Sequence, residues 1–212
     1  MSDITGSHGS TARSAQARLW ALLGVAAAMW TALVVVLFVW SGRFSLAAVD
    51  LACGAPAPDV RTAPSPADVH AFIAGCGPDG LAAYRDLQLV DLLYPAVNAA
   101  LLVLVLALLA SALPRGLRWV LALPVVAAVG DYAENVAAWT LLARGGDGSG
   151  WAERLFQAGS AVKVAATCSS WTAVLILLAW VMARAVTARQ RDHGGAAADP
   201  VVERGPEPLT RA

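Results

Sequence analysis

Four long apolar blocks dominate the pattern of hydrophobic and polar positions along this chain. They cover residues 19–40, 91–113, 117–142 and 155–183. Each block meets the length of about 20 apolar residues that a helix needs to cross a bilayer. Most connections between them are short, and the exception is the segment 41–86. The pattern therefore predicts an all-α, polytopic membrane protein, with one domain at 18–189 built as a bundle of four transmembrane helices.

The two ends of the chain lack such blocks. Residues 1–17 are rich in Ser, Gly and Thr, and residues 190–212 are rich in Gly, Ala, Pro and Glu. Neither segment has an apolar period, so both are predicted to be disordered tails. The first apolar block shows no small-residue cleavage site, and it follows Arg13 and Arg18. We therefore expect it to be a retained helix and not a cleaved signal peptide.

The composition agrees with membrane insertion and limits the kinds of partner that the protein can bind. Hydrophobic residues make up 58% of the chain and charged residues 14%, a balance outside that of soluble domains. The expected partner is the lipid bilayer. The formal net charge is zero, and the sequence offers no basic face, so nucleic-acid binding is excluded.

The arginines beside the blocks predict orientation, because Lys and Arg near span ends are retained in the cytoplasm. A cytoplasmic N-terminus gives the better distribution, so we expect a multi-pass protein of the cell membrane with both termini cytoplasmic. This orientation places Cys53 and Cys76 in the outer segment 41–86, where an oxidising compartment permits a disulfide. The arginines then inside are Arg13, Arg18, Arg115, Arg118, Arg184, Arg189 and Arg191, and those outside are Arg43, Arg85, Arg144 and Arg154.

The outer segment 41–86 contains five prolines among Gly, Ala and Asp, a composition that disfavours long regular structure. The predicted disulfide would restrain it. His70 is interpreted as a solvated loop histidine. From Leu81 the pattern turns helical and is expected to lead without a break into the second block. Cys168, in the fourth block, is interpreted as a small apolar core residue.

The third block carries the most informative polar residues of the chain. Asp131, Glu134 and Asn135 stand at i, i+3 and i+4, so they share one face of a helix. Gly130 and Ala127 beside them are small, which allows a neighbouring helix to come close. Ionisable groups inside a membrane are costly and rarely face lipid, so this face is a candidate functional site.

The second and fourth blocks add polar residues at similar depth. Asp91, Tyr94 and Asn98 form a stripe at the outer end of the second block, where Pro95 is expected to kink the helix and leave an acceptor free. Counting about 1.5 Å per residue places this stripe and the third-block cluster at matching heights. Lys163, the only lysine, lies on a polar face of the fourth block. It either snorkels outward or pairs with Glu134, and we favour pairing.

Two of these motifs carry a resemblance. Asp91-Leu-Leu-Tyr94-Pro95 and Asp131-Tyr-Ala-Glu134-Asn135 resemble a D-x-x-Y-P and D-x-x-E-N pattern in uncharacterised four-helix integral membrane proteins of bacteria. The resemblance covers the bundle but not the tails. It implies a fold and no established activity.

Three interpretations of these residues stay open. The first is a buried polar network that only fixes helix packing, with interhelical bonds worth on the order of 1 kcal/mol each. Against it, three acids face one lysine, so protons or a cation must balance the cluster. The second is a binding or conduction site for a proton, a metal cation or a small cationic molecule, in which case four spans suggest a homo-oligomer. The third is an intramembrane enzyme, with Asp131 and Glu134 as acid and base on a lipid-like substrate.

The sequence lacks the residues that several kinds of chemistry require. No histidine lies in any predicted span, which argues against haem ligation and histidine-based proton transfer. No C-x-x-C is present, which argues against a thiol oxidoreductase. No cofactor is therefore expected.

Overall fold

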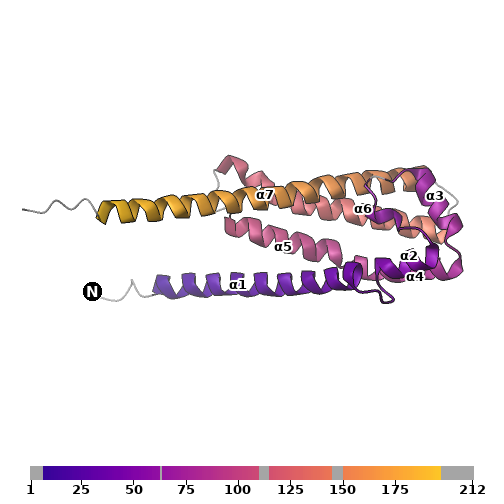
Figure 1. Cartoon of the computed structure of the whole chain (residues 1–212), viewed down its shortest axis with the longest axis horizontal. Helices are drawn as coiled ribbons and strands as arrows, with labels where there is room; N and C mark the ends of the chain where they lie inside the picture. Colours follow the sequence, from indigo (N-terminus) through magenta and orange to yellow (C-terminus); the bar gives the residue numbers. More distant parts are fainter. Residues whose placement is uncertain (1–6, 63, 110–114, 145–149, 197–212) are drawn as a thin grey trace, which may run out of the picture.

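The computed structural model of the chain is an elongated helical bundle with a cap of shorter helices at one end (Figure 1). It describes residues 7–62, 64–109, 115–144 and 150–196. Within those ranges every regular element is helical. Four helical segments are long and apolar enough to cross a membrane: Ser14–Val39, Pro78–Leu109, Arg115–Ala143 and Gly150–Gln190. The prediction of an all-α chain with four candidate spans is confirmed.

The long elements run side by side along the bundle (Figure 1). Helix α1 reaches into the segment that was expected to be a disordered tail, and α7 likewise extends past residue 190. The rest of both predicted tails and residues 110–114 and 145–149 lie outside the described residues. The elements are α1 (Ser7–Val34), its π-helical continuation η1 (Val35–Val39), α5 (Tyr94–Leu109), the 3-10 helix η4 (Arg115–Ala122), α6 (Leu123–Ala143) and α7 (Gly150–Ala196).

The outer segment differs from the irregular loop that its composition predicts. It folds into α2 (Leu46–Cys53), the 3-10 helix η2 (Pro58–Val60), α3 (Pro66–Gly75) and α4 (Pro78–Asp91), and we call the part from α2 to α3 the cap. Three of the five prolines, Pro58, Pro66 and Pro78, stand in first turns, where a missing N–H costs nothing. The other two lie between the helices.

Side-chain caps fix where the two main cap helices begin. Ser45 accepts a hydrogen bond from the Ala48 N–H at 3.2 Å and starts α2. Ser65 and Asp68 form a reciprocal capping box at the start of α3, with the Ser65 N–H donating to Asp68 at 2.9 Å. Gly54 ends α2 with a φ of 66°, a left-handed conformation that favours glycine. Capping interactions between residues close in sequence therefore allow this Pro-rich segment to form helices.

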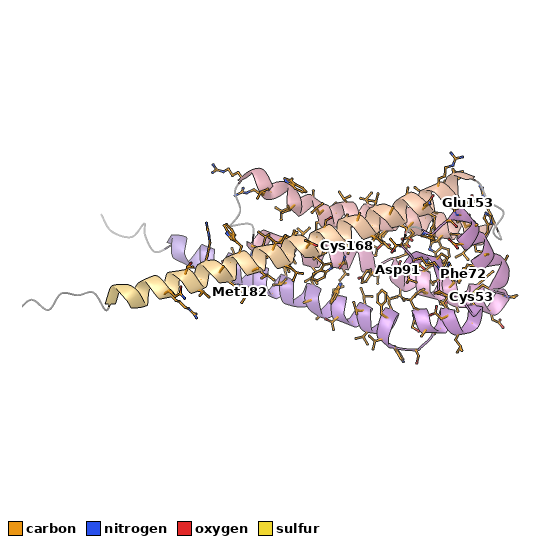
Figure 2. The ribbon with its side chains drawn as sticks, turned by 45° about the horizontal axis from the view of Figure 1, so that its top comes forward. Cys53, Phe72, Asp91, Glu153, Cys168 and Met182 are labelled. Carbon is orange, nitrogen blue, oxygen red and sulfur yellow. A yellow bond between two sulfur atoms is a disulfide. The ribbon has the colours of Figure 1, made fainter. Side chains whose placement is uncertain are left out.

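A disulfide within the cap and a side-chain contact from the cap to α7 stabilise this end of the molecule. The predicted disulfide between Cys53 and Cys76 is present and joins α2 to the end of α3. His70 is not a solvated loop residue, because it lies on α3 and pairs with Glu153 of α7. Figure 2 shows Cys53 and Glu153 at the capped end, with Cys168 and Met182 progressively farther along the bundle.

The expected continuous helix from residue 81 into the second span is interrupted. Helix α4 ends at Asp91, two turn residues follow, and α5 begins at Tyr94. Pro95 has no N–H to donate to the Asp91 carbonyl and its ring crowds that carbonyl, which explains the break. The exposed Tyr132 hydroxyl of α6 donates to the Leu92 carbonyl at 3.0 Å. The sequence predicts that Pro95 leaves the Asp91 carbonyl without its helical donor. At this kink the neighbouring Leu92 carbonyl receives its hydrogen bond from α6.

Helices α6 and α7 make the most extensive contact of the bundle, and glycines allow it. A Cβ added at Gly130 would lie 2.7 Å from the Lys163 backbone nitrogen, and one added at Gly159 would lie 2.7 Å from the Gly130 carbonyl oxygen. Ala127 is also buried in this part of α6. The predicted close approach at Gly130 is confirmed, and it brings α7 directly against the acidic face of α6.

Candidate functional site

Lys163 of α7 lies at the centre of the polar cluster. Its Nζ is 2.5 Å from Glu134 Oε2 and 3.4 Å from Asp131 Oδ1, both on α6. The Glu134 side chain is 0% exposed, and that of Lys163 is 19% exposed. The ammonium therefore pairs inward with the predicted partner and does not snorkel. The close backbone contact at Gly130 and Gly159 sets the register that places these groups together.

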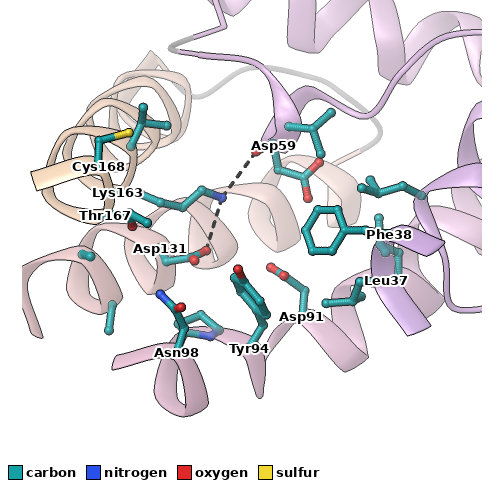
Figure 3. Close-up of a pocket in the computed structure, with 17 residues that line it drawn as sticks. Leu37, Phe38, Asp59, Asp91, Tyr94, Asn98, Asp131, Lys163, Thr167 and Cys168 are labelled. Carbon is teal, nitrogen blue, oxygen red and sulfur yellow. Dashed lines mark hydrogen bonds and ion pairs between the residues drawn. The ribbon is translucent and has the colours of Figure 1, made fainter. Parts of the chain in front are cut away.

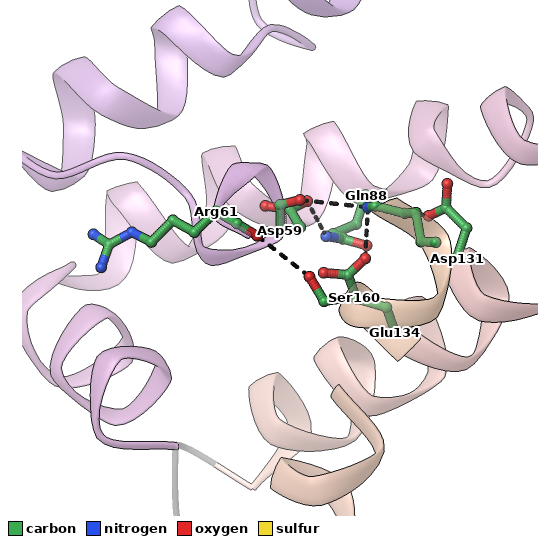
Figure 4. A network of polar contacts seen from close by, with 7 residues as sticks. Asp59, Arg61, Gln88, Asp131, Glu134 and Ser160 are labelled. Carbon is green, nitrogen blue, oxygen red and sulfur yellow. Dashed lines mark hydrogen bonds and ion pairs between the residues drawn. The ribbon is translucent and has the colours of Figure 1, made fainter. Parts of the chain in front are cut away.

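A fourth carboxylate comes from the cap and was not predicted. Asp59, in η2, contributes its backbone carbonyl to Lys163 Nζ at 3.3 Å, and its Oδ2 accepts from Gln88 Nε2 at 3.0 Å. Figure 4 shows Gln88 bonded to Asp59, and Ser160 of α7 bonded to the neighbouring Arg61 carbonyl. Burial, together with the negative charge of Asp91, raises the pKa of Asp59 to about 6 from its usual 3.8.

These groups border a cavity of about 290 Å³ that receives side chains from every long helix and from the cap. Its polar lining includes Asp59, Asp91, Asp131, Lys163 and Thr167 (Figure 3). Its apolar lining includes Leu37, Phe38, Leu46 and Leu87. Phe38, Val60 and Cys168 are exposed lining residues, so the cavity communicates with the surface of the protein.

The predicted stripe on the second span lies in this cavity. Asp91, Tyr94 and Asn98 all line it, together with Asp131 of the third span, so the two stripes meet as their matching heights predicted. The Asn98 side chain accepts a hydrogen bond from Trp30 Nε1 of α1 at 3.0 Å. The ring of Tyr94 packs edge-on against Phe38 with centroids 5.9 Å apart. Helix α1 therefore closes one side of the site and is more than an inert scaffold.

Two predicted site residues lie elsewhere. Glu134 is fully buried beside the cavity and does not line it. Asn135 is 1% exposed and borders a separate hollow of about 590 Å³, whose lining also includes Tyr132, Trp139 and Arg144. Glu134 nevertheless stays within reach of Lys163 at 2.5 Å.

Cys168 is another correction, because it is exposed at the edge of the cavity and is not a core residue. It follows Thr167 on α7, and both residues line the cavity. The chain has three cysteines, and the other two form the disulfide. Cys168 is therefore the free thiol of this protein and adjoins the site.

Two residues of the site were missed for different reasons. Gln88 stands three positions before Asp91, so the polar stripe could have been extended back to it. Asp59 lies between Pro58 and Val60 in a stretch without any periodic pattern. Its position over the bundle depends on the folded cap and the disulfide, and sequence spacing carries no signal for it.

The charges of the site do not balance. Asp59, Asp91, Asp131 and Glu134 surround one ammonium group, and that ammonium contacts Asp131 and Glu134. In the described part of the chain, Asp59 Oδ1 and Asp91 Oδ2 are buried without a hydrogen-bond partner. Buried carboxylate oxygens without partners are costly, so the cavity favours protons or a positively charged ligand.

The site has no three-residue metal-ligand set: among the described residues, no group of three or more His, Cys, Asp or Glu side chains is arranged to hold a metal ion. Comparisons of the chain with family models, with curated proteins and with solved structures found no match. Its function is therefore argued from the cavity and the chemistry of its lining.

Proposed function

We propose that this chain is a multi-pass protein of the cell membrane that binds a cation in the cavity bordered by Asp59, Asp91 and Asp131. The observation that carries the proposal is the pair of buried carboxylate oxygens, Asp59 Oδ1 and Asp91 Oδ2, that have no partner within the described residues. Both residues line the cavity. A cation there would receive charge-assisted contacts from groups that are otherwise unsatisfied.

The resident lysine does not remove the need for a ligand. Lys163 is held by Glu134 at 2.5 Å and by Asp131 at 3.4 Å, and its contact to Asp59 is with the backbone carbonyl. Its charge is thus directed at the α6 carboxylates. Among the described residues, Lys163 forms no ion pair with the side chain of Asp59 or Asp91, so a bound cation would be the direct charge partner of these two carboxylates.

Orientation in the membrane is part of the proposal. The N-terminal end of α1 and the C-terminal end of α7 lie at the same end of the bundle, opposite the cap (Figure 1). With the disulfide-bonded cap outside, this end is cytoplasmic, which agrees with the distribution of arginines. The cavity then opens in the outer half of the membrane.

A purely structural role is the second candidate, and the position of Lys163 favours it. Its ammonium connects α7 to α6 and to the cap through three contacts, as a packing device would. A structural network predicts that no added cation changes the stability of the protein. It also predicts that neutralising Asp59 and Asp91 stabilises the fold by removing unpaired buried charge.

Thermal unfolding of the purified protein in lipid nanodiscs separates the two candidates. Sodium, potassium, ammonium and methylammonium chlorides are compared at equal ionic strength. Binding predicts that at least one cation raises the unfolding temperature and that the Asp59→Asn, Asp91→Asn double variant loses the response. Asp50→Asn, which changes an exposed acid on α2, is the matched control. Absence of any response in the wild-type protein would overturn the proposal.

A further inference from the structure

The size of the cavity bears on which cation it takes. A proton or a bare metal ion would fill only a small part of its roughly 290 Å³. That volume is close to the lower limit of about 300 Å³ for pockets that hold organic ligands. The cavity therefore has room for a small organic molecule.

The two kinds of lining residue come from different elements. Leu37 and Phe38 of η1, Leu46 of α2 and Leu87 of α4 supply an apolar wall. Lys163, Thr167 and Asp131 lie across the cavity from Phe38 in Figure 3. A ligand that is charged at one end and apolar at the other satisfies both kinds of surface, whereas an inorganic cation leaves the apolar wall uncovered.

An aromatic ring lines the same cavity as the carboxylates of Asp59 and Asp91. In Figure 3 the ring of Phe38 appears between the carboxylates of Asp59 and Asp91, and all three residues line the cavity. Tyr94 packs against this ring in an edge-to-face arrangement. Phe38 remains 52% exposed, so part of its ring surface is available to a ligand. Carboxylates next to an aromatic face are the chemistry by which proteins hold organic ammonium groups.

We infer that the ligand is a small organic ammonium ion with an apolar body, its nitrogen held by Asp59 and Asp91 and its body packed against Phe38 and Leu46. This inference rests on the proposed cation-binding function and narrows it to one class of ligand. Asp59 then determines affinity through charge, and Phe38 determines selectivity through its ring.

Cys168 provides a reporter at the edge of the cavity, because it is a free exposed thiol and the other cysteines are disulfide bonded. The experiment measures the rate of its alkylation by N-ethylmaleimide in nanodiscs, with the unfolding temperature as a second readout. The probes are benzylammonium, methylammonium and the uncharged isostere benzyl alcohol. In the wild-type protein, benzylammonium should slow alkylation and raise the unfolding temperature at lower concentration than methylammonium, and benzyl alcohol should do neither.

Two variants test which residues contact the ligand. Asp59→Asn should abolish protection by benzylammonium. Phe38→Leu should weaken benzylammonium roughly fivefold, the loss expected from one aromatic ring contact. Methylammonium should be nearly unchanged, because it has no apolar body to pack against the ring. Phe44→Leu is the matched control, since Phe44 is a partly exposed ring that packs against Arg43 and does not line the cavity.

The outcomes separate this inference from the proposed function. Equal potency of methylammonium and benzylammonium in the wild-type protein would overturn the organic-ligand inference and leave cation binding intact. Equal protection by benzyl alcohol would overturn the role of the ammonium group. No response to any inorganic or organic cation would overturn both proposals. The comparison of the three probes in the wild-type protein tests the inference even if Phe38→Leu does not fold.

Discussion

Gly159 of α7 lies directly against Gly130 of α6, so close that a methyl group at Gly159 would be 2.7 Å from the Gly130 carbonyl oxygen and 2.7 Å from the Glu134 backbone nitrogen. The obstacles are backbone atoms, which cannot rotate away as a side chain can. This contact determines the spacing of α6 and α7, and therefore the distance from Lys163 to the two carboxylates of α6.

Gly159→Ala should separate the two helices and destabilise the bundle by about 1–3 kcal/mol, the usual cost of overpacking. Unfolding in nanodiscs measures the change. Gly24→Ala is the control, because a methyl group there meets nothing within 4 Å and alanine is the better helix former. If both variants change stability equally, the close contact is not what holds the helices in register.

Lys163→Met should destabilise the protein strongly, by about 3–5 kcal/mol, because Glu134 would be left buried without a partner. Glu134→Gln in the same chain should recover part of the loss. A double-mutant cycle on unfolding free energies measures the coupling between the two side chains. Additive effects of the two substitutions would show that the 2.5 Å contact contributes no net pairing energy.

Stability should depend on pH through Asp59. Its pKa of about 6 in the folded protein exceeds the usual 3.8, mainly because of burial, so the folded state binds this proton more tightly than the unfolded state. The contribution is fully present below about pH 4 and is lost as the pH rises through 6. Asp59→Asn should flatten the stability profile between pH 4 and 7. Asp50→Asn, which removes an exposed carboxylate of α2, is the matched control, and a flat profile in the wild-type protein would contradict the prediction.

Reduction of the Cys53 and Cys76 disulfide should destabilise the cap by about 3 kcal/mol, as the chain-entropy account gives for a closed loop of this length. Hydrogen exchange of α2 and α3 with and without reductant measures the effect.

The same bond tests orientation. In a Cys168→Ser background, an impermeant maleimide should label intact cells only after reduction. Labelling that requires permeabilised cells would place the cap in the cytoplasm and overturn the proposed topology.

The sequence by itself determined the class of fold and half of the site. Apolar blocks of sufficient length predict the four candidate spans, and helical spacing alone places Asp131 with Glu134 and Asp91 with Asn98. Capping chemistry was also readable in Ser65 and Asp68, although composition suggested an irregular loop there. Such features depend on residues within a few positions of one another, so one sequence contains the whole signal.

Only the tertiary structure decided which long-range partners meet. Asp59 reaches the cavity because the cap folds over the bundle, 104 residues before the Lys163 that its carbonyl contacts. Lys163 turned inward because Gly130 and Gly159 let α7 approach the acidic face of α6, and the polar spacing of α7 agreed with either direction. Asn135 borders a different hollow from the cavity that Asp131 lines. The docking of the cap and the contacts between helices depend on packing between segments distant in sequence. Such packing produces no periodic pattern of residues that could be read from the sequence.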